Sequence, residues 1–174
     1  CEGGTGNIKA EGNYAGSLLP AKLAKATKLP PPYDKIGISD VIYLDGGMVT
    51  EAGAANIFRK NGNTIFTPSA QHGTILEGVT RDSIIKKAAD LGYHVVSNED
   101  QPIEGFLDAD EVWLSGTGAI ITPIGLIMHR GNIHVINDFK VGATTRQIHD
   151  TLLGIQTGVL PDTHGWTRII KKAA

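Results

Sequence analysis

The 22 glycines spread along the 174 residues constrain this chain more than any other feature. Glycine adopts backbone conformations that other residues avoid, so it marks tight turns and places where the backbone passes close to a ligand. The glycines separate short apolar segments, and no internal repeat is evident. The chain is therefore expected to consist of short elements joined by turns, with enough residues for one domain and its own core.

Strands are expected where β-branched and aromatic residues cluster between turn residues. The strongest signal is a hairpin over residues 56–67, whose Asn61-Gly62 pair is typical of a two-residue turn. Further strands are expected over residues 41–44, 94–97, 111–114 and 119–128. The last of these contains Pro123 and Gly125, which interrupt it.

Helices are expected over residues 13–28, 80–91 and 144–157. The second should begin with Thr80 as its N-cap and end at Gly92. Its apolar face consists of Ile84, Ile85, Ala88 and Leu91. The third has an inward face formed by Ile148, Leu152 and Ile155, and Gly158 ends it.

The first expected helix contains Pro20, which should kink it or mark a restart. The prolines at 30–32 end this helix and open a loop that reaches about Ser39 and is interpreted as a surface insertion. Strands outnumber helices, and no regular βαβ alternation is present. The pattern therefore favours an α+β fold.

Composition and charge exclude several classes of partner. The formal charge of −2 provides no basic field for nucleic acid or an anionic membrane, and no apolar run approaches the ~20 residues that cross a bilayer. The single cysteine, Cys1, cannot form an internal disulfide and fits a reducing compartment, so the cytoplasm is expected and the mitochondrion stays open. His129 and His134 flank a Gly131-Asn132 turn and are interpreted as surface residues, so no metal site is expected.

Lys9 lies in the glycine-rich run GGTGNIKAEGNYAGSLL, five residues before Tyr14. A lysine that holds a cofactor covalently must lose its proton and attack a carbonyl carbon. Glycines let the backbone pass close to a flat ring, and Tyr14 could donate a hydrogen bond to a ring oxygen. A phosphate-loop interpretation fails, because that motif needs glycine before the lysine and Ser or Thr after it, where this chain has Ile8 and Ala10. The alternative is a flexible turn with a solvated lysine.

Two further segments offer backbone N–H groups to an anion. In LEGVTRD, residues 76–82, Gly78 leads into an expected helix N-terminus, where free amides and the helix dipole favour negative charge. Thr80 could add a hydroxyl there. In SGTGA, residues 115–119, small residues between two apolar strands could expose amides as an anion nest. An ordinary capped helix and a plain turn between strands are the alternatives.

Five motifs occur in order along the whole chain: GGTGNIKAEGNYAGSLL, VTEAGAANIF, ILEGVTRDSI, LSGTGAIITPIG and GIQTGVLPDTHGW. Together they resemble the branched-chain amino acid aminotransferases, which are fold-type IV pyridoxal-phosphate enzymes. The resemblance implies mixed and antiparallel sheets with flanking helices, as in the large C-terminal domain of that family, and makes residues 1–174 a single cofactor-binding domain. The family's small N-terminal domain has no counterpart here, so a truncated or cleaved product, or one of two chains, is expected.

The resemblance also implies roles for individual residues. Lys9 matches the catalytic lysine that holds pyridoxal 5'-phosphate, and Tyr14 matches the phenol that contacts the ring oxygen. Glu51 stands in a small, uncharged run and is either the solvated end of a strand or, by the resemblance, the carboxylate that keeps the ring nitrogen protonated. The phosphate would be bound by Gly78, Val79, Thr80, Gly116 and Thr117, and the substrate carboxylate would face the amides of Gly118 and Ala119.

Three positions depart from the family's pattern. Glu11 stands where glycine is common, Glu77 replaces the usual proline, and Ala54 stands where many members have a threonine. Each is expected to weaken cofactor binding without removing a group that performs chemistry. Asn56 occupies the family's asparagine position and is assigned only a structural role.

The implied function is transamination of leucine, isoleucine or valine with 2-oxoglutarate, giving branched 2-oxo acids and glutamate, in a complete enzyme rather than in this chain alone. The implied partners are these small-molecule substrates, an N-terminal half of the same enzyme and a second copy in a homodimer. Two related activities remain alternatives, D-amino acid aminotransferase and aminodeoxychorismate lyase. A non-catalytic half domain that serves assembly is a third.

Overall fold

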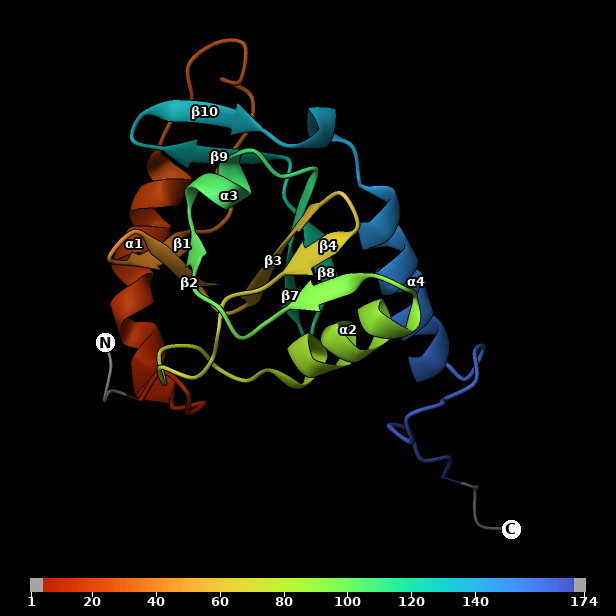
Figure 1. Ribbon diagram of the computed structural model, residues 1–174. Helices are drawn as coiled ribbons and strands as arrows, with labels where there is room; N and C mark the ends of the chain where they lie inside the picture. The colour runs from red at the N-terminus through yellow and green to blue at the C-terminus, as the bar shows by residue number, and fades with distance from the viewer. Residues whose placement is uncertain (1–4, 171–174) are drawn as a thin grey trace.

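The computed structural model describes residues 5–170, which form an α+β arrangement of three sheets with helices on their outer sides (Figure 1). The expected fold class is confirmed, and Cys1 lies outside the described residues. In chain order, the elements are a 3₁₀ turn (Glu11–Tyr14), α1 (Ala15–Ala26), β1 (Ile42–Asp45), β2 (Met48–Ala52), β3 (Asn56–Asn61), β4 (Thr64–Phe66), α2 (Val79–Asp90), β5 (His94–Val96), β6 (Gln101–Pro102), α3 (Glu104–Leu107), β7 (Glu111–Gly116), β8 (Ile120–Pro123), β9 (Leu126–His129), β10 (Asn132–Val135), a second 3₁₀ turn (Asn137–Phe139) and α4 (Ala143–Gln156).

The largest sheet has five strands in the order β5-β4-β3-β7-β8, and its neighbours are antiparallel except for the parallel pair β4 and β5. The hairpin expected over residues 56–67 is confirmed as β3 and β4. Asn61 pairs with Thr64, so the two-residue connection consists of Gly62 and Asn63, one position beyond the expected pair. Gly62 has a φ of +55°, which glycine adopts without strain.

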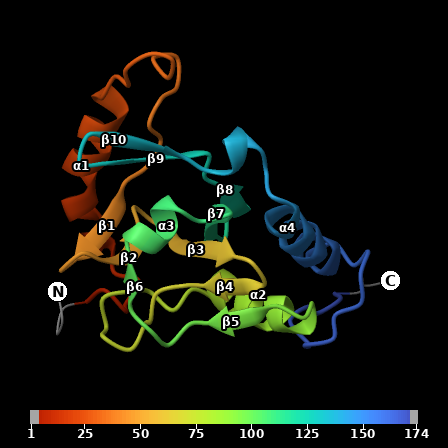
Figure 2. The ribbon, with the colours of Figure 1, turned by 45° about the horizontal axis from the view of Figure 1, so that its top comes forward.

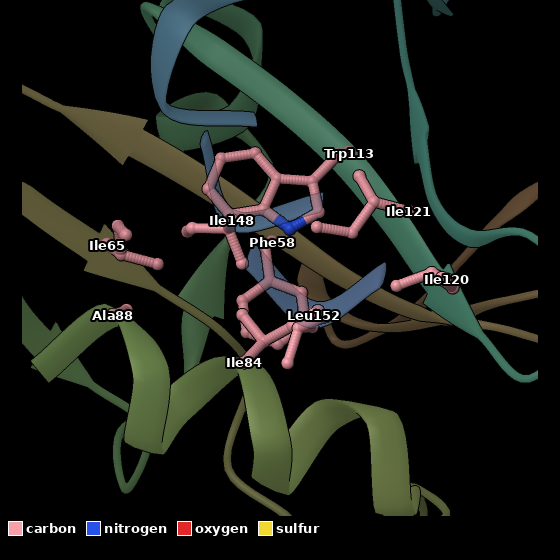
Figure 3. Close-up of a cluster of buried hydrophobic side chains, with 9 residues drawn as sticks. All are labelled: Phe58, Ile65, Ile84, Ala88, Trp113, Ile120, Ile121, Ile148 and Leu152. Atoms are coloured by element: carbon pink, nitrogen blue, oxygen red, sulfur yellow. The ribbon is translucent and has the colours of Figure 1, made fainter. Parts of the chain in front are cut away.

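Side chains alternate between the two faces of this sheet. Phe58 and Trp113 lie opposite each other in β3 and β7, and their rings stack with centroids 5.6 Å apart. Their neighbours Ile57 and Val112 point to the other face, into a second apolar cluster. Figure 3 shows the first cluster, in which Phe58 and Trp113 meet residues of α2, α4 and the adjoining strands: Ile65, Ile84, Ala88, Ile120, Ile121, Ile148 and Leu152.

The second face of the sheet is covered by smaller elements, of which the sequence predicted β1, as the strand over residues 41–44, and part of β9, but not β2, β6 or α3. The three-stranded sheet β1-β2-β6, the short helix α3 and the β9-β10 hairpin contribute to the second cluster. Over residues 119–128, where a strand interrupted by Pro123 and Gly125 is expected, the structure has β8 and β9, which are separated at that point and belong to different sheets. Gly125 lies in the break, and a Cβ there would lie 2.9 Å from the ring of Phe139, so only glycine permits this close packing.

Two details of the helices differ from expectation. Gly78, in an extended conformation, is the N-cap of α2, and Thr80 already lies inside the helix, so the expected Thr80 cap is wrong. Pro20 does not restart the first helix, because α1 runs through it as one helix with no buried residue. Gly92 ends α2 with a φ of +86°, as expected. The inward face expected for α4 is confirmed by the buried Ile148, Leu152 and Ile155.

The helices are distributed on different sides of the molecule. Figures 1 and 2 both show α1 on the side away from α4. The tail that follows α4 returns to the end of α2, where His164 contacts Asp90 (Figure 2). Within residues 5–170, none of the helices has both the length and the apolar character needed to cross a membrane.

Candidate functional site

A cavity of about 110 Å³ lies where the N-terminal segment, β2, the start of α2 and the end of β7 meet. In Figure 1 the N-terminal segment and the start of α2 lie on the same, lower side of the molecule. Gly118 and Ala119 are exposed in the turn after β7 and do not line this cavity. The lining does include the other candidate residues: Lys9, Tyr14, Glu51, Gly78, Val79, Thr80, Gly116 and Thr117.

The segment that carries Lys9 is held in shape by the side chain of Asn13. The Asn13 amide donates hydrogen bonds to the carbonyl oxygens of Thr5 at 2.7 Å and Ile8 at 2.9 Å. These bonds close the segment into a compact turn just before the 3₁₀ turn. These local hydrogen bonds therefore hold the conformation of the segment that carries Lys9.

The same segment is also attached to the rest of the molecule. The backbone N–H of Asn7 donates to the carbonyl oxygen of Gly73 at 3.1 Å. A Cβ on Gly6 would lie 2.7 Å from the carbonyl oxygen of Thr74, so only glycine permits this approach. Gly6 thus lets the N-terminal segment form one wall of the cavity.

Lys9 and Tyr14 form a local pair at the cavity. The Lys9 Nζ donates a hydrogen bond to the Tyr14 hydroxyl at 3.1 Å and lies 5.5 Å from the ring centroid. The Lys9 side chain is exposed, so it is open to a ligand that enters from solvent. This contact orients the amine, while the expected contact of Tyr14 with a ring oxygen stays a prediction.

Glu51 faces the cavity from β2, is half-buried and lies close enough to Lys9 for the two charges to interact. Burial raises the pKa of the Glu51 carboxyl above its usual range, while a hydrogen bond from the Leu76 backbone and the charge of Lys9 oppose this effect. A partly desolvated carboxylate is stabilised by a nearby cation. The cavity therefore favours a ligand with a positive group beside Glu51.

The start of α2 presents free backbone amides at the cavity. The first amides of a helix have no acceptor within the helix, and here they follow Gly78 directly. Asn56, at the start of β3, donates a hydrogen bond from its side chain to the carbonyl oxygen of Leu76 at 2.8 Å. A Cβ on Gly78 would collide with the side-chain oxygen of Asn56. Asn56 thus holds the segment that leads into Val79 and Thr80, in line with its expected structural role.

Arg81, which the sequence interpretation passed over, anchors this helix end from the other side. Its guanidinium is buried and donates to the carbonyl oxygens of Pro68 at 2.9 Å and Ser97 at 3.2 Å. Burial lowers the pKa of Arg81, and the nearby carboxylates of Glu77 and Asp82 oppose that effect. Since Arg81 does not line the cavity, it positions α2 rather than a ligand. An arginine in the first turn after an expected anion site was the available sequence signal.

A second, larger cavity of about 390 Å³ lies elsewhere and is lined mainly by apolar side chains, among them Ile42, Leu114 and Ile124. Ala52 faces it, whereas its neighbour Glu51 lines the first cavity. His129 lines it as well and is partly exposed. Residues 5–170 contain no group of three or more His, Cys, Asp or Glu side chains placed to hold a metal ion.

Known proteins share both the sequence and the fold. The mitochondrial branched-chain-amino-acid aminotransferase 1 of Arabidopsis thaliana is 43% identical over 169 residues, covering 94% of this chain and 40% of the relative. The solved branched-chain amino acid aminotransferase of Escherichia coli has a TM-score of 0.76 and 34% identity, over 91% of this chain and 47% of that one. The T.th. branched-chain amino acid aminotransferase, solved in complex with N-(5'-phosphopyridoxyl)-L-glutamate, has a TM-score of 0.77 and 31% identity, over 92% of this chain and 50% of that one.

The chain thus spans half the length or less of these relatives. The family match itself extends from residue 11 to residue 127, which is more than half of the chain. It includes β2, the start of α2 and the turn after β7, so most segments around the cavity lie within it. On this match, the chain belongs to the family Amino-transferase class IV.

Proposed function

We propose that this chain forms the pyridoxal 5'-phosphate site of an enzyme that transaminates leucine, isoleucine or valine with 2-oxoglutarate. The observation that carries the proposal is one cavity that joins the Lys9 and Tyr14 pair, the carboxylate of Glu51 and the N-terminus of α2. The names of the relatives, all branched-chain aminotransferases, support the choice of substrate.

The residues around the cavity fit this cofactor group by group. The first amides of α2 and the hydroxyls of Thr80 and Thr117 suit its phosphate. Glu51 suits the ring nitrogen, Tyr14 the ring oxygen, and the exposed amine of Lys9 the aldehyde carbon. When bound, the cofactor supplies an electron sink for negative charge at the substrate α-carbon.

Each side chain then has a defined task. The Lys9 Nζ takes the proton from the substrate α-carbon and returns it at the cofactor carbon that bears the nitrogen. The Tyr14 hydroxyl, 3.1 Å from that Nζ, orients the amine between these two positions. Glu51 holds a proton on the ring nitrogen, and this cationic partner offsets the penalty that burial imposes on its carboxylate.

The substrate end of the pocket requires more than this chain. The exposed amides of Gly118 and Ala119 are proposed to bind the substrate carboxylate at the mouth of the cavity. The relatives are twice as long or longer, and α1 exposes Leu18, Leu19 and Leu23. We therefore propose an N-terminal half of the same enzyme and a homodimer as partners, in the cytoplasm or in the mitochondrion.

The first test is covalent capture of the cofactor. Purified protein is mixed with pyridoxal 5'-phosphate, reduced with borohydride and digested, and the modified peptide is identified by mass spectrometry. We expect modification at Lys9, which Lys9→Ala removes and Lys22→Ala, at an exposed lysine on α1, retains. Modification spread evenly over surface lysines contradicts the proposal, and it leaves a non-catalytic half domain as the better description.

The second test separates related activities. In the complete enzyme, with the N-terminal half present, glutamate formation from 2-oxoglutarate is measured with leucine, isoleucine, valine and D-alanine as donors. Aminodeoxychorismate is supplied separately to detect lyase activity. We expect transfer from the three branched-chain amino acids. A preference for D-alanine, or cleavage of aminodeoxychorismate, contradicts the proposed substrates but not the proposed cofactor site.

A further inference from the structure

Two neighbouring cross-strand pairs of β3 and β7 lie on the same face of the sheet. Phe58 pairs with Trp113, and Asn56 pairs with Ser115. Residues two apart in a strand share a face, so Asn56 and Ser115 continue the surface on which Phe58 and Trp113 meet α2. The first pair is apolar and stacked, and the second is polar and lies at the end of the sheet where α2 begins.

The two polar side chains differ in one respect. Asn56 is satisfied by its hydrogen bond to the carbonyl oxygen of Leu76. Ser115 is only 3% exposed, and its hydroxyl has no hydrogen-bond partner among residues 5–170. A buried polar group without a partner destabilises the folded state, so it calls for an explanation. The explanation lies in its position, because Ser115 lines the cavity.

The groups around Ser115 indicate what it binds. The cavity that Ser115 lines is also lined by the start of α2, with its free amides and Thr80, and by Gly116 and Thr117 of the turn that follows. All of these groups donate hydrogen bonds, and Arg81, the buried cation at this end of α2, donates elsewhere. A hydroxyl that lines the same cavity as these donors suits an anion with several acceptor oxygens.

We infer that the Ser115 hydroxyl donates a hydrogen bond to the phosphate group of pyridoxal 5'-phosphate. The inference rests on the proposed function and adds an anion-binding residue to those that the sequence indicated. It also accounts for a buried serine beside Trp113 on the face of β7 that packs against α2. The Ser115 hydroxyl is thus expected to stabilise the ligand-bound state and to destabilise the ligand-free folded state.

The test compares Ser115→Ala with Ser69→Ala. Ser69 is equally buried, at 3% exposure, but its hydroxyl already accepts a hydrogen bond from the Gln71 amide outside the cavity. Dissociation constants are measured by visible absorbance for pyridoxal 5'-phosphate and for pyridoxal, which lacks the phosphate. We expect Ser115→Ala to raise the first constant about 10-fold and to leave the second unchanged, because one charge-assisted hydrogen bond is lost. Ser69→Ala should change neither.

Thermal unfolding without ligand provides the second measurement. Ser115→Ala should have the same Tm as the wild type or a higher one, since it removes an unpaired buried hydroxyl. A lower Tm, or equally weakened binding of pyridoxal 5'-phosphate and pyridoxal, shows a structural role for Ser115 and overturns the inference. Unchanged binding of pyridoxal 5'-phosphate overturns it as well. Failure of the proposed function is a different result: the wild type itself then binds no pyridoxal 5'-phosphate at Lys9.

Discussion

At the scale of single residues, Glu51 shows a conflict between stability and the proposed chemistry. Its carboxyl is half-buried in β2, and burial raises its pKa despite the backbone hydrogen bond from Leu76 and the charge of Lys9. Partly desolvated carboxylates of this kind are common at functional sites, where a ligand supplies the missing partner. In the ligand-free chain, the ionised form of Glu51 therefore opposes folding.

The pH dependence of stability tests this conflict. The folded-state pKa of Glu51 lies above its usual value of 4.5. Between 4.5 and the raised pKa, the folded state therefore binds more protons than the unfolded state, and the free energy of unfolding falls as pH rises. Glutamine cannot ionise. We expect Glu51→Gln to be more stable than the wild type at pH 7 and to lose that advantage near pH 4, as measured by urea unfolding. The exposed Glu11→Gln serves as the control, and an advantage independent of pH contradicts the argument.

At the scale of elements, α4 depends on a cap that comes from another part of the chain. Its N-cap is Gly142, which has no side chain to accept the first amides. Glu111 of β7 accepts them instead, from the N–H groups of Thr144 at 3.2 Å and Thr145 at 2.8 Å and from the Thr145 hydroxyl at 2.7 Å. A Cβ on Gly142 would collide with the Glu111 carboxylate, so glycine is required there.

Removal of this cap should be costly. We expect Glu111→Ala to lower the free energy of unfolding by about 2–3 kcal/mol, because it leaves buried donors without a charged acceptor. Glu111→Gln, which keeps an acceptor oxygen, should lose less. The measurement is urea unfolding, with Glu104→Ala in the exposed first turn of α3 as the control. A loss no larger than that of the control argues against the cap.

At the scale of the whole molecule, the C-terminal tail closes back onto α2. Asp90 accepts a hydrogen bond from Lys87 at 2.7 Å, and His164 lies 2.8 Å from the same oxygen. The His164 ring stacks on Trp166 at 4.5 Å, and Trp166 packs against the cluster that contains Trp113. This chain of contacts joins residues 74 positions apart.

Hydrogen exchange should detect this closure. The hydrogen bonds from Lys87 and His164 lower the pKa of Asp90 below its usual 3.8, so their contribution is present above pH 3.8 and is lost as pH falls through the lowered pKa. We expect Asp90→Asn to speed exchange in residues 162–168 at neutral pH while the strands of the large sheet keep their protection. Asp82→Asn, at the other ion pair of α2, is the control. Equal exchange of the tail in both variants argues that Trp166 alone holds it.

The amino-acid sequence predicted the helices and strands that have a local sequence signal. The β3-β4 hairpin follows from alternation and a turn, and α2 and α4 follow from apolar faces of helical period. It did not predict β2, β6 or α3. The strand β6 has two residues and the helix α3 has four, which is too short for a periodic signal, and β6 forms only by pairing with β2, which is distant in the sequence. The Thr80 cap was wrong, because Gly78 precedes α2 as its N-cap and lies against the side chain of Asn56, a residue distant in the sequence. The interruption expected at Pro123 and Gly125 is confirmed, but only the structure shows that β8 and β9 belong to different sheets.

For the candidate site, the sequence by itself determined the parts that lie within one short segment. The spacing of Lys9 and Tyr14 and the glycine before α2 are local features that the sequence shows directly. Contacts with Gly73 and Asn56, which are distant in the sequence, hold the two segments in place. Only the tertiary structure decided that Glu51 faces the same cavity and that Ser115 stays buried without a partner among the described residues. The physical reason is that local conformation depends on nearby residues, whereas strand register and packing decide which distant side chains meet.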